Sequence, residues 1–108
     1  NFVGTGGFGP WMISSDEIPD PSVLHIETRL NGKVMQSAPI SDLVFNVPKL
    51  IAYISSFTEL EAGDVIITGT TGGVGAARKP PVWMKAGDTV EVEISKIGTL
   101  TNPILDAN

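Results

Sequence analysis

Apolar and polar side chains alternate from residue 23 to residue 30, which is the pattern of a strand with one buried face. The two faces separate by residue type, with Leu24, Ile26 and Leu30 on one side and His25, Glu27 and Arg29 on the other. The pair Asn31-Gly32 follows at once and favours a two-residue turn, because both residues tolerate positive φ angles. We therefore predict a hairpin in which residues 33–36 return antiparallel and Met35 faces Thr28.

A helical period follows in residues 47–57, where apolar side chains recur three or four positions apart. Asn46 is a suitable N-cap, and Pro48 is tolerated in the first turn of a helix. We predict one amphipathic helix of about three turns here, preceded by a connector over residues 39–46.

The same Ala-Gly-Asp turn occurs at residues 62–64 and 86–88, and each copy leads into a run rich in β-branched residues. The first run, Val65 to Thr68, predicts a strand buried on both faces. The second, Thr89 to Ile94, predicts a strand with one face in water, and Gly98 to Thr101 is expected to close the sheet. One helix among about five strands indicates a rolled β or α+β unit and argues against a doubly wound sheet.

Charge and composition narrow the possible partners. The 108 residues carry seven basic and twelve acidic side chains, a formal net charge of −5. Such a chain repels phosphate backbones and anionic membrane surfaces, so we expect no nucleic acid and no membrane as partner, and a nucleic-acid-binding β-barrel is disfavoured. The absence of cysteine and the single histidine exclude disulfides, thiolate zinc sites and imidazole clusters.

The sequence has no long apolar segment and no leader pattern, from which we expect a cytoplasmic location. Its first residue, Asn1, is not methionine and is followed closely by a glycine run. We take the chain to be the interior of a longer sequence.

Two glycine-rich loops are candidates for ligand binding. The first, Gly4 to Gly9, has the spacing of a dinucleotide fingerprint, but Pro10-Trp11 follows and no helical period begins. Its glycines instead permit close backbone approach. The second, Thr68 to Gly75, leaves the most hydrophobic run of the chain and can present threonine hydroxyls and backbone N–H groups to a carboxylate. An ordinary strand-to-loop exit is the alternative, and a P-loop is excluded because no Gly-Lys-Ser/Thr ending is present.

Other polar clusters favour structural roles. Three carboxylates near the start of the chain, Asp16, Glu17 and Asp20, have the chemistry of a metal or acid-base group. Ser14 and Glu17 nevertheless have capping-box spacing, and Asp20-Pro21 is a turn element. His25 stands on the outward face with no evident nucleophile beside it, and Arg78-Lys79 is interpreted as a solvated charged loop, with a guard for acidic substrates as the alternative.

A series of short motifs along nearly the whole chain resembles the fumarylacetoacetate hydrolase family. No single motif is specific, but their order is that of the family. They are Gly9-Pro10-Trp11, Asp16-Glu17-Ile18-Pro19-Asp20-Pro21, Leu30-Asn31-Gly32, Ser41-Asp42, Leu50-Ile51-Ala52-Tyr53, Gly63-Asp64-Val65-Ile66, Thr68-Gly69-Thr70, Gly72-Gly73-Val74-Gly75, Gly87-Asp88 and Gly98-Thr99-Leu100.

This resemblance implies a mainly β (α+β) fold, a mixed β-roll or β-sandwich of the family's carboxy-terminal type with one amphipathic helix. Residues 1–108 would be the carboxy-terminal portion of a catalytic domain whose upstream portion is missing. The complete enzyme would act on 2-oxo or β-diketo acids by carbon–carbon hydrolysis, decarboxylation or keto-enol isomerisation, as a homodimer. It would use Mg²⁺, or Mn²⁺ or Ca²⁺, to chelate the substrate and stabilise an enolate.

The family's metal-binding and catalytic residues have no counterparts in the chain, so the resemblance implies no catalytic or metal-ligating residue here and an inactive isolated chain that binds no metal. Thr70 matches the threonine that binds the substrate carboxylate, with Gly69 as its backbone neighbour. Gly4 and Thr5 match the segment in which a threonine of the family touches metal-bound water, with Gly4 in that register and Thr5 one place later. Thr71 stands where relatives often have proline, which makes it a candidate for an additional hydroxyl in the pocket. A non-catalytic β-rich binding or assembly module is the alternative.

Overall fold

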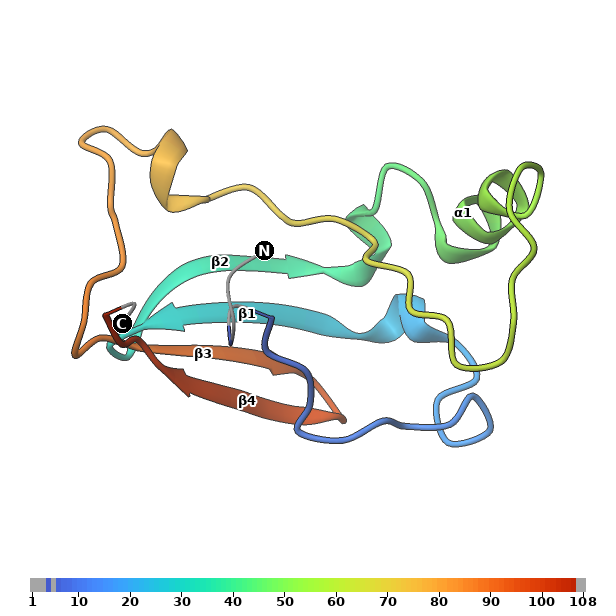
Figure 1. Cartoon of the computed structure of the whole chain (residues 1–108), viewed down its shortest axis with the longest axis horizontal. Coiled ribbons are helices and arrows are strands. Elements are labelled where there is room, and N and C mark those ends of the chain that lie inside the picture. The colour runs from blue at the N-terminus through green and yellow to red at the C-terminus, as the bar shows by residue number, and fades with distance from the viewer. Residues whose placement is uncertain (1–3, 5, 107–108) are drawn as a thin grey trace.

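The computed structural model describes residue 4 and residues 6–106. Within these residues the chain forms four strands, one α-helix and three short 3-10 helices (Figure 1). In chain order they are a 3-10 helix (Pro21–Val23), β1 (His25–Leu30), β2 (Lys33–Pro39), a 3-10 helix (Ile40–Asp42), α1 (Val47–Ile54), a 3-10 helix (Gly75–Ala77), β3 (Thr89–Ile94) and β4 (Gly98–Pro103). The predicted mainly β class with one helix is confirmed.

The four strands form a single antiparallel sheet in the order β2-β1-β3-β4. Directly opposite residues of neighbouring strands project to the same side of the sheet, so the alternating side chains of the strands form two faces. The inner face pairs Ile26 with Ile94 and Leu30 with Val90, whereas the outer face pairs Glu27 with Glu93. The predicted separation of apolar and polar faces in β1 and β3 is therefore confirmed.

The hairpin of β1 and β2 contains an irregularity that the sequence analysis missed. Its turn follows the prediction, with Asn31 at φ 51° and Leu30 opposite Lys33. The register then shifts between Thr28 and Arg29, so that Thr28 faces Gln36 and not Met35. The predicted pairing of Met35 is wrong because a bulge inserts one extra residue into β2, which turns Gln36 to the inner face.

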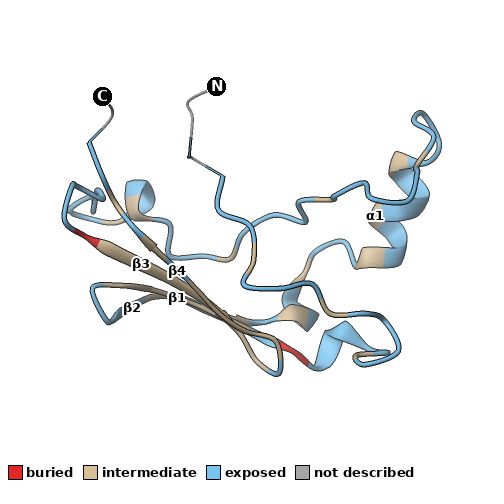
Figure 2. Ribbon diagram, turned by 60° about the horizontal axis from the view of Figure 1, so that its bottom comes forward, coloured by how far each residue is buried: buried red, intermediate tan, exposed pale blue. Residues whose placement is uncertain are grey.

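Helix α1 lies beyond one end of the sheet, so that it does not cover the middle of either face (Figures 1 and 2). The predicted cap is confirmed, since the Asn46 side chain accepts a hydrogen bond from the backbone N–H of Lys49 at 3.0 Å. The helix ends at Ile54, earlier than the predicted end near Phe57, and turns continue to that residue.

The long connection from α1 to β3 arches over the β2 side of the sheet (Figure 1). The strand predicted at Val65 to Thr68 is wrong, because this segment of the connection has no regular structure. Val65 and Ile67 expose 64% and 91% of their surface, so the predicted burial is wrong as well. A strand needs a hydrogen-bonded neighbour, and none of the described strands runs beside this segment.

Very little of the chain is buried. Among the described residues only Leu24 and Asp88 are buried, at 5% and 7% exposure, and both lie next to the starts of strands (Figure 2). The chain exposes 8448 Å² of surface, whereas a compact protein of 11.4 kDa exposes about 5,800 Å². Its radius of gyration is 15.5 Å, against about 13 Å for a compact domain of this length. The sheet therefore positions a site without enclosing a core.

Candidate substrate-binding site

A cavity of about 430 Å³ opens between the inner face of the β1–β2 hairpin, the connector before α1 and the loop at residues 68–72. Its walls are mostly apolar, with polar groups concentrated on the loop and on β2. The lining residues are Ile26, Thr28, Gln36, Ala38, Pro39, Ile40, Asp42, Leu43, Val44, Phe45, Leu50, Thr68, Gly69, Thr70, Thr71 and Gly72. An apolar cavity with a few convergent polar groups is the usual form of a small-molecule site.

The side chain of Gln36 holds the loop against β2. The amide nitrogen of Gln36 lies 2.8 Å from the hydroxyl oxygen of Thr70 and 2.8 Å from the carbonyl oxygen of Thr71. A third, longer contact of 3.3 Å reaches the hydroxyl of Thr71. Gln36 therefore connects the sheet to the two threonines at the cavity wall.

Both residues predicted to contact a substrate, Gly69 and Thr70, line this cavity. Gly69 has φ 111°, a conformation that side chains rarely adopt, so glycine is required where the loop passes the cavity. The predicted loop thus lies at a site of suitable size, while its role in binding stays a prediction.

The other predicted positions lie elsewhere or outside the described residues. Gly4 is exposed and does not line the cavity. Thr5 lies outside the described residues, so its suggested place near a metal stays a prediction.

The described residues do not fit a metal ion. Asp42 is the one carboxylate among those that line the cavity. Across the described part of the chain, no three His, Asp or Glu side chains come together in a group that could hold a metal. A hard cation with several carboxylate ligands is therefore not accommodated by these residues alone.

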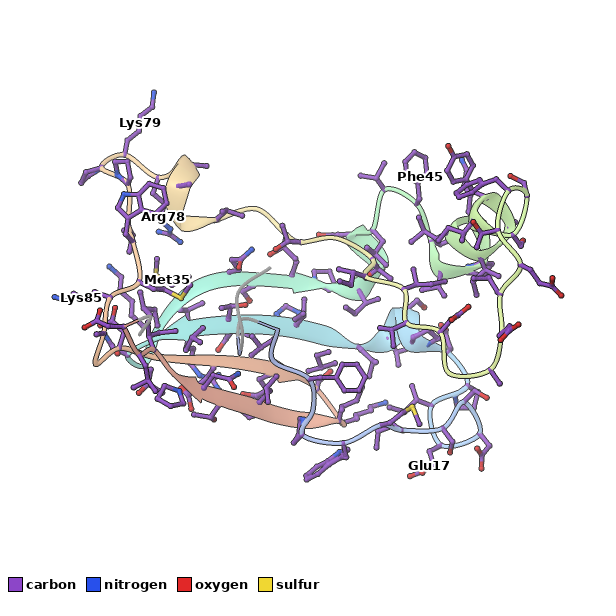
Figure 3. The ribbon with its side chains drawn as sticks, viewed as in Figure 1. Glu17, Met35, Phe45, Arg78, Lys79 and Lys85 are labelled. Atoms are coloured by element: carbon purple, nitrogen blue, oxygen red, sulfur yellow. The ribbon has the colours of Figure 1, made fainter. Side chains whose placement is uncertain are left out.

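The acidic residues near the start of the chain have structural partners. Asp20 caps the 3-10 helix at Pro21–Val23 by accepting from the N–H of Ser22 at 2.9 Å. Hydrogen bonding with the Ser22 side chain, followed by that with its backbone N–H, lowers the pKa of Asp20. Ser14 contacts Glu17 at 3.3 Å within a turn, and Glu17 points away from the sheet (Figure 3). The structural interpretation of this cluster fits its geometry.

Both predicted basic side chains have a partner that the sequence analysis did not assign. His25 is exposed on the outer face of the sheet, as predicted, and its Nε2 lies 2.8 Å from the hydroxyl of Ser37. Both residues are exposed and neither lines the cavity. Arg78 is half-buried and not a free solvated charge, because its guanidinium donates to the carbonyl oxygens of Gly73, at 3.0 Å, and Met35. It fastens the connection to β2, whereas Lys79 points outward (Figure 3).

The residue that sequence reasoning missed is Gln36. In a regular hairpin it would pair with Glu27 on the outer face, whereas the bulge places it opposite Thr28 on the inner face. The sequence does show a polar glutamine within β2. Regular alternation, however, places its side chain on the outer face and not on the cavity side.

The outer face of the sheet carries a compact ionic cluster. The guanidinium of Arg29 contacts the carboxylates of Glu27, Glu93 and Glu91 at 2.7, 2.8 and 3.4 Å. Hydrogen bonds to Glu93 and Glu27 raise the pKa of Arg29 above its ordinary value. This cluster ties β1 to β3 on the side away from the cavity.

Together, the antiparallel sheet, the apolar cavity and the hydroxyl-bearing loop form a β unit with a candidate small-molecule site. Comparison with known proteins specifies its family: residues 1–105 match the family model of the fumarylacetoacetate (FAA) hydrolase C-terminal region. The chain belongs to the fumarylacetoacetate hydrolase family.

Its relatives have several activities. The chain is 45% identical over 97 residues to a mitochondrial oxaloacetate tautomerase of Xenopus laevis, covering 90% of this chain and 30% of that protein. The solved fumarylacetoacetate hydrolase from Exiguobacterium antarcticum superposes with a TM-score of 0.89 and 40% identity, covering 94% of this chain and 36% of that one. A maleylpyruvate hydrolase from Sphingobium sp. SYK-6, solved with manganese(II) and pyruvate, gives 0.82 and 33%, covering 93% and 35%.

The chain thus spans about a third of the length of the relatives it matches. Neither helix α1 nor any other helix in the described residues has the length and apolar character needed to cross a bilayer.

Proposed function

We propose that this chain is the carboxy-terminal, substrate-carboxylate-binding part of an enzyme that acts on 2-oxo or β-diketo acids. Its contribution is Thr70, whose hydroxyl binds the substrate carboxylate, with the Gly69 backbone beside it. The observation that supports this most is the position of the Thr68–Gly72 loop on the wall of a 430 Å³ cavity. Hydrolysis, decarboxylation and keto-enol isomerisation remain the candidate reactions.

The chemistry of the loop suits a carboxylate. A hydroxyl that donates to an ionised oxygen forms a charge-assisted hydrogen bond, which is shorter and stronger than a neutral one. The apolar side chains of Ile26, Leu43 and Leu50 line the same cavity and lower the local dielectric constant, which strengthens such a bond. The printed names of two relatives contain small oxo acids: one is an oxaloacetate tautomerase, and the other is a maleylpyruvate hydrolase solved with pyruvate.

The rest of the catalytic machinery is proposed to come from polypeptide that covers the exposed surface of this sheet. The chain exposes about 2,700 Å² more surface than a compact protein of its mass, which leaves apolar surface for such a neighbour to cover. A divalent cation such as Mg²⁺ would find its ligands there, because the described residues do not form a metal site. We assign no step of the reaction to residues of this chain beyond binding and orienting the substrate.

Removing the hydroxyl of Thr70 tests the proposal. In the gene-encoded protein that contains this chain, Thr70→Val is expected to lower kcat/KM for its 2-oxo acid about 10- to 100-fold, since one hydrogen bond to a charged group is lost. Thr70→Ser keeps the hydroxyl and is expected to retain most activity. Thr101→Val, at an exposed position of β4 outside the cavity lining, is the matched control and should leave the kinetics unchanged.

Steady-state assays with Mg²⁺ or Mn²⁺ on oxaloacetate tautomerisation and on acylpyruvate hydrolysis provide the measurement. Equal kinetics for Thr70→Val and the wild type would show that the Thr70 hydroxyl does not bind the substrate carboxylate. A gene-encoded protein without activity on any 2-oxo acid would favour the alternative, a non-catalytic binding or assembly module. Homodimerisation of the complete protein and a cytoplasmic location stay predictions.

A further inference from the structure

The orientation of the Gln36 side-chain amide is determined by its surroundings. A carbonyl oxygen can only accept hydrogen bonds, so the atom of Gln36 that lies 2.8 Å from the Thr71 carbonyl must be the nitrogen. The same nitrogen lies 2.8 Å from the Thr70 hydroxyl oxygen. Because an amide nitrogen carries two hydrogens, one serves each of these contacts.

This arrangement constrains the Thr70 hydroxyl. A hydroxyl has one hydrogen to donate and two lone pairs to accept with, and the Gln36 amide occupies one lone pair. The amide has no hydrogen-bond acceptor on that nitrogen, so the Thr70 hydrogen must point elsewhere. In the described part of the chain no group accepts it, and Thr70 is an exposed residue on the cavity wall. The hydrogen is thus available to a ligand.

Thr71 provides the contrast within the same loop. Its hydroxyl donates to the carbonyl oxygen of Gly72 at 3.2 Å, so its hydrogen stays within the loop. Its contact with Gln36 is the longer one, 3.3 Å. Of the two neighbouring threonines, only Thr70 therefore keeps a free donor, which argues against Thr71 as the additional substrate hydroxyl.

We propose that Gln36 is a positioning residue, which orients the Thr70 hydroxyl so that its hydrogen points at the carboxylate of the substrate. This inference rests on the proposed function of Thr70 and extends it to the residue that prepares the donor. The β2 bulge makes this arrangement possible, since it brings Gln36 to the inner face opposite Thr28. A donor already aimed at its acceptor loses less orientational freedom on binding than a freely rotating hydroxyl.

A double-mutant cycle on pyruvate affinity tests the inference. Four forms of the gene-encoded protein are compared in the presence of Mn²⁺: wild type, Gln36→Met, Thr70→Val and the double variant. Methionine keeps the length of glutamine but removes both donors. If Gln36 acts through Thr70, each single variant weakens pyruvate binding about tenfold and the double variant also about tenfold, because the same hydrogen bond is lost in all three.

The control is Ser37→Ala, the next residue of β2, whose side chain contacts His25 on the opposite face. It should bind pyruvate like the wild type. Thermal unfolding shows whether each variant is folded, and Gln36→Asn, which withdraws the amide by one methylene, replaces Gln36→Met if the latter unfolds.

Two results separate the inference from the proposal on which it rests. Multiplicative losses, about a hundredfold in the double variant, would overturn the inference, since Gln36 would then act on the loop or on pyruvate independently of Thr70. Unchanged affinity in Thr70→Val would overturn the carboxylate role of Thr70 itself, and the inference with it. Equal losses in the single and double variants support both.

Discussion

The same turn occurs twice in this molecule, but the segments that follow the two copies have different structures. At residues 62–64 and 86–88 the sequence Ala-Gly-Asp forms the same local structure, with glycine φ angles of 103° and 89°. In each turn the aspartate carboxylate accepts a hydrogen bond at 2.9 Å from the backbone N–H three residues earlier. The aspartate N–H donates to the carbonyl of that same residue, at 3.1 and 3.0 Å. Only the second turn is followed by a strand.

The difference lies in what surrounds each turn. Asp88 also accepts from the side chain of Asn31 at 2.8 Å, and β3 runs between β1 and β4. Asp64 is exposed, and none of the described strands is a neighbour of Val65 to Thr68. Similar residues with β-branched side chains thus become a strand only where partners complete the backbone hydrogen bonds, which shows that β-propensity depends on context.

Amide exchange should give the largest contrast between the two segments. In the 108-residue chain, amides of β3 are expected to exchange at least about 100-fold more slowly than those of Val65 to Thr68, because only β3 is paired on both sides. Hydrogen–deuterium exchange followed by mass spectrometry or NMR measures this ratio.

The same exchange measurement on the gene-encoded protein tests whether Val65 to Thr68 pairs there. If additional polypeptide supplies a neighbouring strand, Val65 to Thr68 should gain protection there. Equally fast exchange in the gene-encoded protein would show that Val65 to Thr68 does not form a paired strand there either.

Removing the charge of each turn aspartate should have unequal effects. Asp88→Asn is expected to lower the unfolding temperature more than Asp64→Asn, because Asp88 is buried and bonds Asn31 as well as its own turn. Thermal unfolding of the matched pair measures the difference. Equal decreases would show that the local turn, and not the contact across the sheet, provides the stabilisation.

The pH dependence of the same pair follows from the pKa of Asp88. The bond from Asn31, followed by that from the Lys85 backbone, lowers this pKa from its ordinary 3.8. A carboxyl whose folded-state pKa is lowered stabilises the fold above its unfolded value, and the contribution is lost as pH falls through the lowered folded value. Stability should therefore fall below about pH 4 in the wild type, and Asp88→Asn should show a shallower decrease.

The smallest expected effect tests the opposite end of the contact. Asn31 has φ 51°, so Asn31→Gly keeps the turn conformation while removing the bonds to Asp88 and to the Thr89 N–H. Loss of these hydrogen bonds should lower the free energy of unfolding by about 1–2 kcal/mol, measured by denaturant titration. Gly32→Ala at φ 77° is a control for turn strain that leaves the contact with Asp88 in place.

Much of the sheet could be predicted from the sequence because its information is local. Alternation in residues 24–30, the Asn31-Gly32 turn and the Asn46 cap depend on near neighbours, and each has the predicted structure. The loop at Thr70 could be placed as a candidate by its glycines and hydroxyls alone. Its partner Gln36 could not, because the bulge that directs this side chain inward has no clear local sign.

The sequence by itself determined the strand faces, the turns, the helix cap and the family, since these depend on side-chain periodicity, backbone preferences of a few residues and ordered motifs. Only the tertiary structure decided that Gln36 meets Thr70 and that Arg78 fastens the connection to β2. It also decided that Val65 to Thr68 stays unpaired. The physical reason is that strand pairing, register and contacts between distant segments depend on which backbone groups come to lie side by side, and no short stretch of sequence contains that information.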